Sequence, residues 1–68
     1  MNRLRELREA RGVTKTWLAR KINVHYNTLT NWESGRVAIP ATSLVELSAY
    51  FGVSIEYLLG AGEPAARP

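Results

Sequence analysis

Residues 26–33, YNTLTNWE, gather side chains that can form hydrogen bonds with the edges of nucleic-acid bases. In a helix, Leu29 and Trp32 fall on one side of this segment. The opposite side is polar and uncharged, and it carries Tyr26 at its edge together with Asn27, Thr30 and Asn31. An Asn amide can form two hydrogen bonds with adenine, and a Tyr ring can contact a thymine methyl group. Asn and Thr are also ordinary solvated residues, but this side lacks the Glu and Lys typical of an inert helix surface, so we expect it to read bases.

A helix-turn-helix is the element that would position these side chains. Residues 14–33 contain two short amphipathic helical patterns separated by a central break. Thr14 is expected to cap the first helix, whose apolar face carries Leu18, Ala19 and Ile22. Asn23 tolerates the left-handed backbone conformation that a tight turn requires. The second helix is expected to cover about residues 26–33, with His25 in its N-cap position.

Three further helices are expected to complete the fold. The first covers about residues 3–11, with Asn2 as its cap, and an Arg5–Glu9 pair four residues apart can support it. A core helix follows the loop that contains Pro40, because apolar residues recur at intervals of three and four after it. Ser43 and Glu46 have the spacing of a capping box for this helix, with Thr42 as the alternative cap.

The end of the chain is expected to hold a short helix and a tail. Ser54 is well placed to cap the segment IEYLL. Residues 61–68, AGEPAARP, are small and rich in Pro and Gly, with almost nothing to bury. We therefore expect one all-α domain over residues 1–60 and a flexible tail over residues 61–68.

Composition excludes several classes of function. The 68 residues include no Cys and one His, so neither a disulfide nor a metal site is expected. The apolar runs are short and interrupted by charge, which predicts a cytoplasmic protein with no membrane span and no secretion signal. A nucleophile–base pair, a phosphate-cradling glycine loop and a carboxylate cluster are all lacking, so we expect no catalysis, no cofactor and no small-molecule ligand.

Positive charge is concentrated in the half of the chain that contains the helix pair. Residues 1–36 hold eight Lys or Arg against three Glu, a net charge of +5, whereas residues 37–68 hold one Arg against three Glu, a net charge of −2. Such clustering is typical of a surface that binds a polyanion such as nucleic acid. On charge alone, solvated helix faces explain it equally well.

Four motifs in order resemble the Cro/C1-type, or XRE-type, helix-turn-helix family of phage repressors and small bacterial regulators. They are L-R-E-x-R-G, T-x-x-x-L-A, V-x-x-x-T-L-x-x-W-E-x-G and V-S-I-E-Y-L-L-G, and together they cover about residues 3–60. The resemblance implies a compact five-helix, lambda-repressor-like bundle that binds operator DNA as a homodimer, with the helix at residues 26–33 in the major groove.

The resemblance also assigns roles to individual residues. Tyr26, Asn27 and Asn31 match positions that commonly contact bases, and Thr30 lies between them. Lys15, Ser34 and Arg36 match positions that contact phosphate, although Lys15 stands where many members carry Gln, which contacts a phosphate or a base from there. The alternative interpretation of Lys15 is a solvated cation that contacts nothing. Arg11, Arg20 and Lys21 are secondary candidates for phosphate contacts.

Arg8 is expected to have a structural role. It follows Leu4 by four residues, which turns it toward the buried side of the first helix, where a cation needs a partner. In the family the matching Arg pairs with the Glu at the end of the W-E motif, here Glu33. This pair would tie the first helix to the helix that reads bases.

Several aromatic and apolar residues keep two interpretations. Trp17 covers an edge of the core or donates its indole N–H to a phosphate. His25 replaces the usual Ser or Thr cap, and a phosphate contact is its alternative role. Tyr57 and Leu58 match positions at the family's dimer interface but can equally close the core.

The resemblance and the residues together predict a sequence-specific DNA-binding transcriptional regulator, acting as a repressor by occluding polymerase. The alternative is a protein-interaction module, such as an antitoxin-like partner, that uses the same fold. That alternative favours an apolar outer surface on residues 26–33, and Asn27, Thr30 and Asn31 argue against it.

Overall fold

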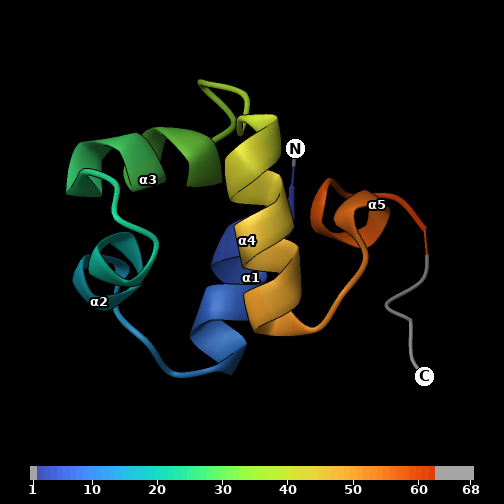
Figure 1. The fold of residues 1–68 in the computed structure, drawn as a ribbon, viewed down its shortest axis with the longest axis horizontal. Helices are drawn as coiled ribbons and strands as arrows, with labels where there is room; N and C mark the ends of the chain where they lie inside the picture. The colour runs from blue at the N-terminus through green and yellow to red at the C-terminus, as the bar shows by residue number, and fades with distance from the viewer. Residues whose placement is uncertain (1, 63–68) are drawn as a thin grey trace.

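The computed structural model describes residues 2–62, and these form five helices in a compact arrangement (Figure 1). The helices are α1 Leu4–Ala10, α2 Lys15–Lys21, α3 Tyr26–Glu33, α4 Ala41–Phe51 and α5 Ile55–Leu58. No strand occurs within residues 2–62, so the prediction of an all-α, five-helix fold is confirmed. None of these helices is long and apolar enough to cross a membrane. The tail predicted for residues 61–68 lies outside the described residues from residue 63 onward.

Each of the five helices contributes one fully buried leucine to a single core. These side chains have 0% exposure and are Leu4, Leu18, Leu29, Leu47 and Leu58. In Figure 1, α4 stands at the centre in front of α1, with α2 and α3 on one side and α5 on the other. All five helices therefore depend on the same apolar cluster, which sets the position of α3 relative to the rest of the chain.

The turn between α2 and α3 has the predicted geometry. Asn23 has a φ of 61°, in the left-handed region that Asn tolerates better than most residues. The amide of Val24 then donates to the carbonyl of Ala19 at 2.9 Å, which closes the turn. At the start of α2, the Thr14 hydroxyl accepts a hydrogen bond from the amide of Trp17 at 3.0 Å, as expected for its cap.

The start of α4 differs from the prediction. The helix begins at Ala41 with Pro40 in the N-cap position, so the expected capping box at Ser43 and Glu46 is wrong, and so is Thr42 as the alternative cap. Pro40 has extended backbone, with a φ of −63° and a ψ of 155°, and its carbonyl accepts the first helical hydrogen bond from the amide of Leu44 at 2.9 Å, so the helix begins directly after it. Ser43 lies inside the first turn and is buried.

The residue that precedes α1 is joined to α5. Ser54 caps this helix as predicted, accepting from the amide of Tyr57 at 3.0 Å. The amide of Arg3 donates to the carbonyl of Leu58 at 2.8 Å, and the Arg3 guanidinium lies 4.2 Å from the centroid of the Tyr57 ring. The Leu58 side chain has 0% exposure and packs in the core of this chain.

Candidate nucleic-acid interface

The structure divides α3 into a buried side and a polar face. Leu29 and Trp32 point inward, with exposures of 0% and 3%. The polar face of α3 consists of the four predicted base-reading residues, of which two are exposed and two partly exposed: Tyr26, Asn27, Thr30 and Asn31. The same helix thus anchors itself in the core and presents hydrogen-bonding groups to the outside.

A buried ion pair fixes α3 against α1. The Nε of Arg8 lies 2.7 Å from Oε2 of Glu33, and its Nη2 lies 3.3 Å from Oε1. The Glu33 side chain is 1% exposed and that of Arg8 is 11% exposed. A third bond runs from Nη1 of Arg8 to the carbonyl of Val13 at 2.9 Å. The predicted pairing of Arg8 and Glu33 is therefore present, with the two-pronged geometry that a guanidinium allows.

Two further contacts hold the same end of α3, and neither was predicted. The Nε of Arg5 lies 3.6 Å from Oε1 of Glu33, so Arg5 joins this carboxylate, whereas the sequence suggested Glu9. The Asn2 amide donates to the carbonyl of Trp32 at 2.8 Å, while its Oδ1 accepts from the amide of Leu4 at 2.9 Å. Arg3 occupies the N-cap position of α1, so the prediction of Asn2 as its cap is wrong by one residue. Asn2 still accepts from the first helical amide and binds α3 at the same time.

Hydrogen bonding to Glu33 raises the pKa of Arg8 above its ordinary value, although burial acts in the opposite direction. A raised pKa in a base means that folding favours its protonated form. Arg8 therefore remains charged in the folded protein over the whole physiological range.

Lys15, the first residue of α2, lies against the polar face of α3. Its Nζ is 3.4 Å from Oγ1 of Thr30 and 5.2 Å from the centroid of the Tyr26 ring. Its side chain is partly buried by these contacts. The structure thus brings together a residue predicted to bind phosphate and two residues predicted to read bases.

The loop that follows α3 contains the exposed residue Arg36. Gly35 has a φ of 81°, a conformation that glycine adopts without strain, and the exposed Arg36 follows it. The Ser34 hydroxyl donates to the carbonyl of Asn31 at 3.1 Å and accepts from the amide of Arg36 at 3.3 Å. In this arrangement Ser34 shapes the loop, and Arg36 is the residue with an exposed charge.

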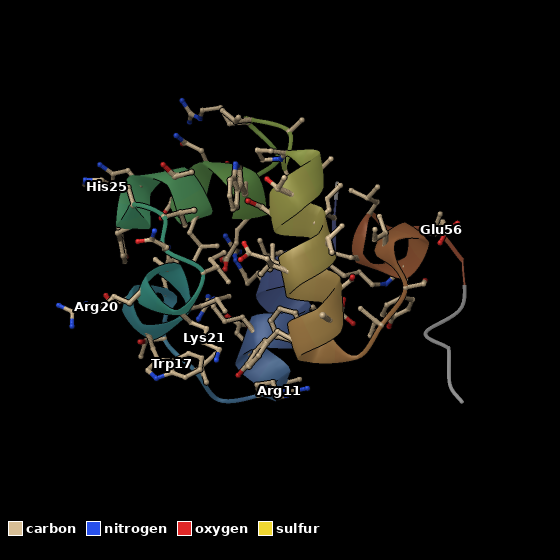
Figure 2. The ribbon with its side chains drawn as sticks, in the orientation of Figure 1. Arg11, Trp17, Arg20, Lys21, His25 and Glu56 are labelled. Carbon is tan, nitrogen blue, oxygen red and sulfur yellow. The ribbon has the colours of Figure 1, made fainter. Side chains whose placement is uncertain are left out.

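The remaining basic residues predicted as phosphate contacts take different positions around the molecule (Figure 2). Arg11 is the C-cap residue of α1; it donates to the carbonyl of Tyr50 at 3.0 Å and lies 4.8 Å from the centroid of that ring. The Trp17 ring also lies near Tyr50, with 5.9 Å between the ring centroids, and Trp17 is 46% exposed. Arg20 and His25 border a shallow hollow between α2 and α3.

Titratable side chains do not assemble into a metal site in this region. Across residues 2–62, no three His, Cys, Asp or Glu side chains are grouped so that they can hold a metal ion. His25 occupies the N-cap position of α3, but its side chain makes no capping hydrogen bond there. The candidate interface is a neutral hydrogen-bonding face on α3. Lys15 contacts this face, and His25 and Arg36 precede and follow α3 in the chain.

Comparison with known proteins decides the family. A family model described as helix-turn-helix matches residues 4–58, which is most of the chain and includes all five helices. The chain belongs to the XRE-type helix-turn-helix family. This membership agrees with the five-helix, lambda-repressor-like architecture and with the geometry of the turn at Asn23.

Two curated proteins of Bacillus subtilis (strain 168) are similar to this member of the XRE-type family. The HTH-type transcriptional regulator ImmR is 38% identical over 65 residues, covering 96% of this chain and 51% of ImmR. The uncharacterized HTH-type transcriptional regulator YobD is 36% identical over 58 residues, covering 85% of this chain and 52% of YobD. The chain thus spans about half the length of the curated relatives it matches. In a separate comparison with solved structures, none matches it.

Proposed function

We propose that this chain is a transcriptional regulator that binds double-stranded DNA in a sequence-specific manner, with α3 in the major groove. The observation that carries the proposal is the division of α3. Its buried side is held by the core and by Glu33, while its polar face is free of charge and can form hydrogen bonds. Such a face suits the major groove, where each base pair presents a distinct set of donors and acceptors.

The dimensions of α3 support this placement. Eight residues at about 1.5 Å of rise each give a helix about 12 Å long. Base pairs are stacked about 3.4 Å apart, so a helix of this length contacts a few of them. Asn27 and Asn31 are one turn apart on the polar face, which suits recognition of adenine within a short half-site.

Phosphate contacts would fix the domain on the duplex. Arg36 and His25 lie at the two ends of α3, and Ser34 orients the loop that carries Arg36. Two copies on a pseudo-palindrome would place their half-site centres about one helical turn, or ~34 Å, apart. If each copy neutralises four phosphates, the logarithm of affinity falls with the logarithm of salt concentration with a slope near −7, from about −0.9 per contact. Repression would then follow from occlusion of polymerase.

Selection of bound duplexes from a random pool, followed by gel shift across salt concentrations, tests the proposal. Replacing Asn27 and Asn31 by Ala is expected to abolish the preference at the base pairs that they contact, while general binding stays largely intact. The control is Ala49→Ser, an uncharged change at an exposed position of α4, which should leave the preference unaltered. Absence of binding to any duplex near 50 mM salt would instead support a protein-interaction module, such as an antitoxin-like partner.

A further inference from the structure

The feature that carries a further inference is the placement of the Lys15 ammonium group over α3. It contacts Tyr26 and Thr30, which are four residues apart and therefore adjacent on the same edge of the polar face. The ammonium is attracted to the face of the Tyr26 ring, and one of its protons points to the Thr30 hydroxyl. Two contacts from one helix thus draw a side chain of the neighbouring helix onto the surface that faces the groove.

We propose that Lys15 reads a guanine in the major groove, with Tyr26 and Thr30 as its positioning partners. This inference rests on the proposed function and changes the phosphate contact that the sequence suggests for Lys15. An ammonium bonded to Thr30 keeps two protons to donate. Guanine presents two acceptors in the major groove, O6 and N7, whereas adenine pairs its N7 acceptor with an N6 donor that would oppose the ammonium.

The position of Lys15 at the first residue of α2 supports a role in binding. The N-terminus of a helix carries partial positive charge, so a cation there is unfavourable for stability. A neutral residue in this position is therefore expected to fold at least as well. Lys15→Met, which keeps the length of the side chain and removes its charge, isolates the binding role without endangering the fold.

The order of residues around α3 predicts where the guanine lies. Tyr26 and Thr30 occupy the edge of the polar face nearest to α2, while Asn27 and Asn31 lie farther round the helix. The guanine should therefore occupy a base pair distinct from those read by the two Asn side chains. Loss of Lys15 and loss of the Asn pair should affect different positions of the half-site.

The test uses the full chain and compares duplex preference for wild type, Lys15→Met and Lys21→Met. Lys21 is the matched control because it is an exposed cation at the other end of α2. Lys15→Met should lose discrimination at one G·C pair by about 5- to 150-fold, the range for one good base contact, and keep the salt slope of wild type. Lys21→Met should keep every base preference.

A duplex in which the selected guanine is replaced by 7-deazaguanine tests the contact at the level of atoms. It should weaken binding by wild type and leave binding by Lys15→Met unchanged, since that variant no longer uses N7. A uniform loss of affinity for all duplexes in Lys15→Met, with a salt slope that is less steep by about 0.9 per copy, would assign Lys15 to phosphate and overturn the inference. The proposed function fails separately, when wild type and Lys21→Met prefer no duplex at all.

Discussion

Replacing Arg8 by Met removes one partner of the buried pair that joins α1 to α3. The variant leaves the carboxylate of Glu33, 1% exposed, without its closest cation. Breaking a buried pair on one side costs about 3–5 kcal/mol, because an uncompensated charge remains inside the protein. Arg5 stays 3.6 Å from the carboxylate, but it is 60% exposed and well solvated, so we expect about 3–4 kcal/mol.

That loss is large relative to the whole stability of the chain. At about 0.05–0.15 kcal/mol per residue, a domain of this size has a free energy of unfolding of roughly 3–10 kcal/mol. The Arg8→Met variant is therefore expected to lose at least about a third of its free energy of unfolding. Replacing both partners, as Arg8→Met with Glu33→Leu, removes the orphaned charge and should restore most of the stability.

Urea denaturation followed by far-ultraviolet circular dichroism measures these differences for each variant. Arg5→Met serves as the control and should change the free energy of unfolding by less than about 1 kcal/mol, as is usual for an exposed cation. Two results would refute the reasoning. One is a stability of Arg8→Met within about 1 kcal/mol of wild type, and the other is a double variant less stable than Arg8→Met alone.

The pH dependence of this pair follows from the raised pKa of Arg8. Stability linked to a base with a raised pKa is complete at lower pH and is lost only as pH rises through the raised value. That value lies far above the physiological range. The difference between wild type and Arg8→Met should therefore show no decline as pH is raised from neutral to mildly alkaline.

Two further predictions concern the framework of the fold. At Asn23, with its φ of 61°, substitution by Ala should cost about 1–2 kcal/mol in urea denaturation, whereas Gly should match or exceed wild type. Equal stability of the Ala and Gly variants would show that the left-handed turn does not constrain this position. Leu58→Ala should cost about 2–5 kcal/mol because the side chain is fully buried. Leu59→Ala, at a residue 46% exposed, should cost much less, and equal costs would contradict the assignment of Leu58 to the core.

Local signals were sufficient to predict most of the fold from the sequence. Asn23 has the left-handed backbone expected of it, and Thr14 and Ser54 form the predicted caps. The start of α4 was not predictable in this way. Ser43 and Glu46 have the spacing of a capping box, but the helix begins earlier, after Pro40, and Ser43 is buried within it.

The contacts at the interface were only partly predictable, because they join residues distant in the chain. The polar face of α3 follows from helical periodicity, since its members are close in sequence. The placement of Lys15 against Thr30, 15 residues away, depends on how α2 and α3 cross. Arg5 meets Glu33 for the same kind of reason. Spacing along the chain identifies such residues but does not pair them.

The division of α3 separates what the helix recognises from what keeps it folded. Its inward anchors and its attachments to α1 involve Leu29, Trp32 and Glu33, and none of these belongs to the polar face. Exchanging the side chains of that face should therefore generate new specificities on an unchanged scaffold. Moving α3 itself into another protein is constrained, because without α1 the Glu33 carboxylate would lose its cationic partners.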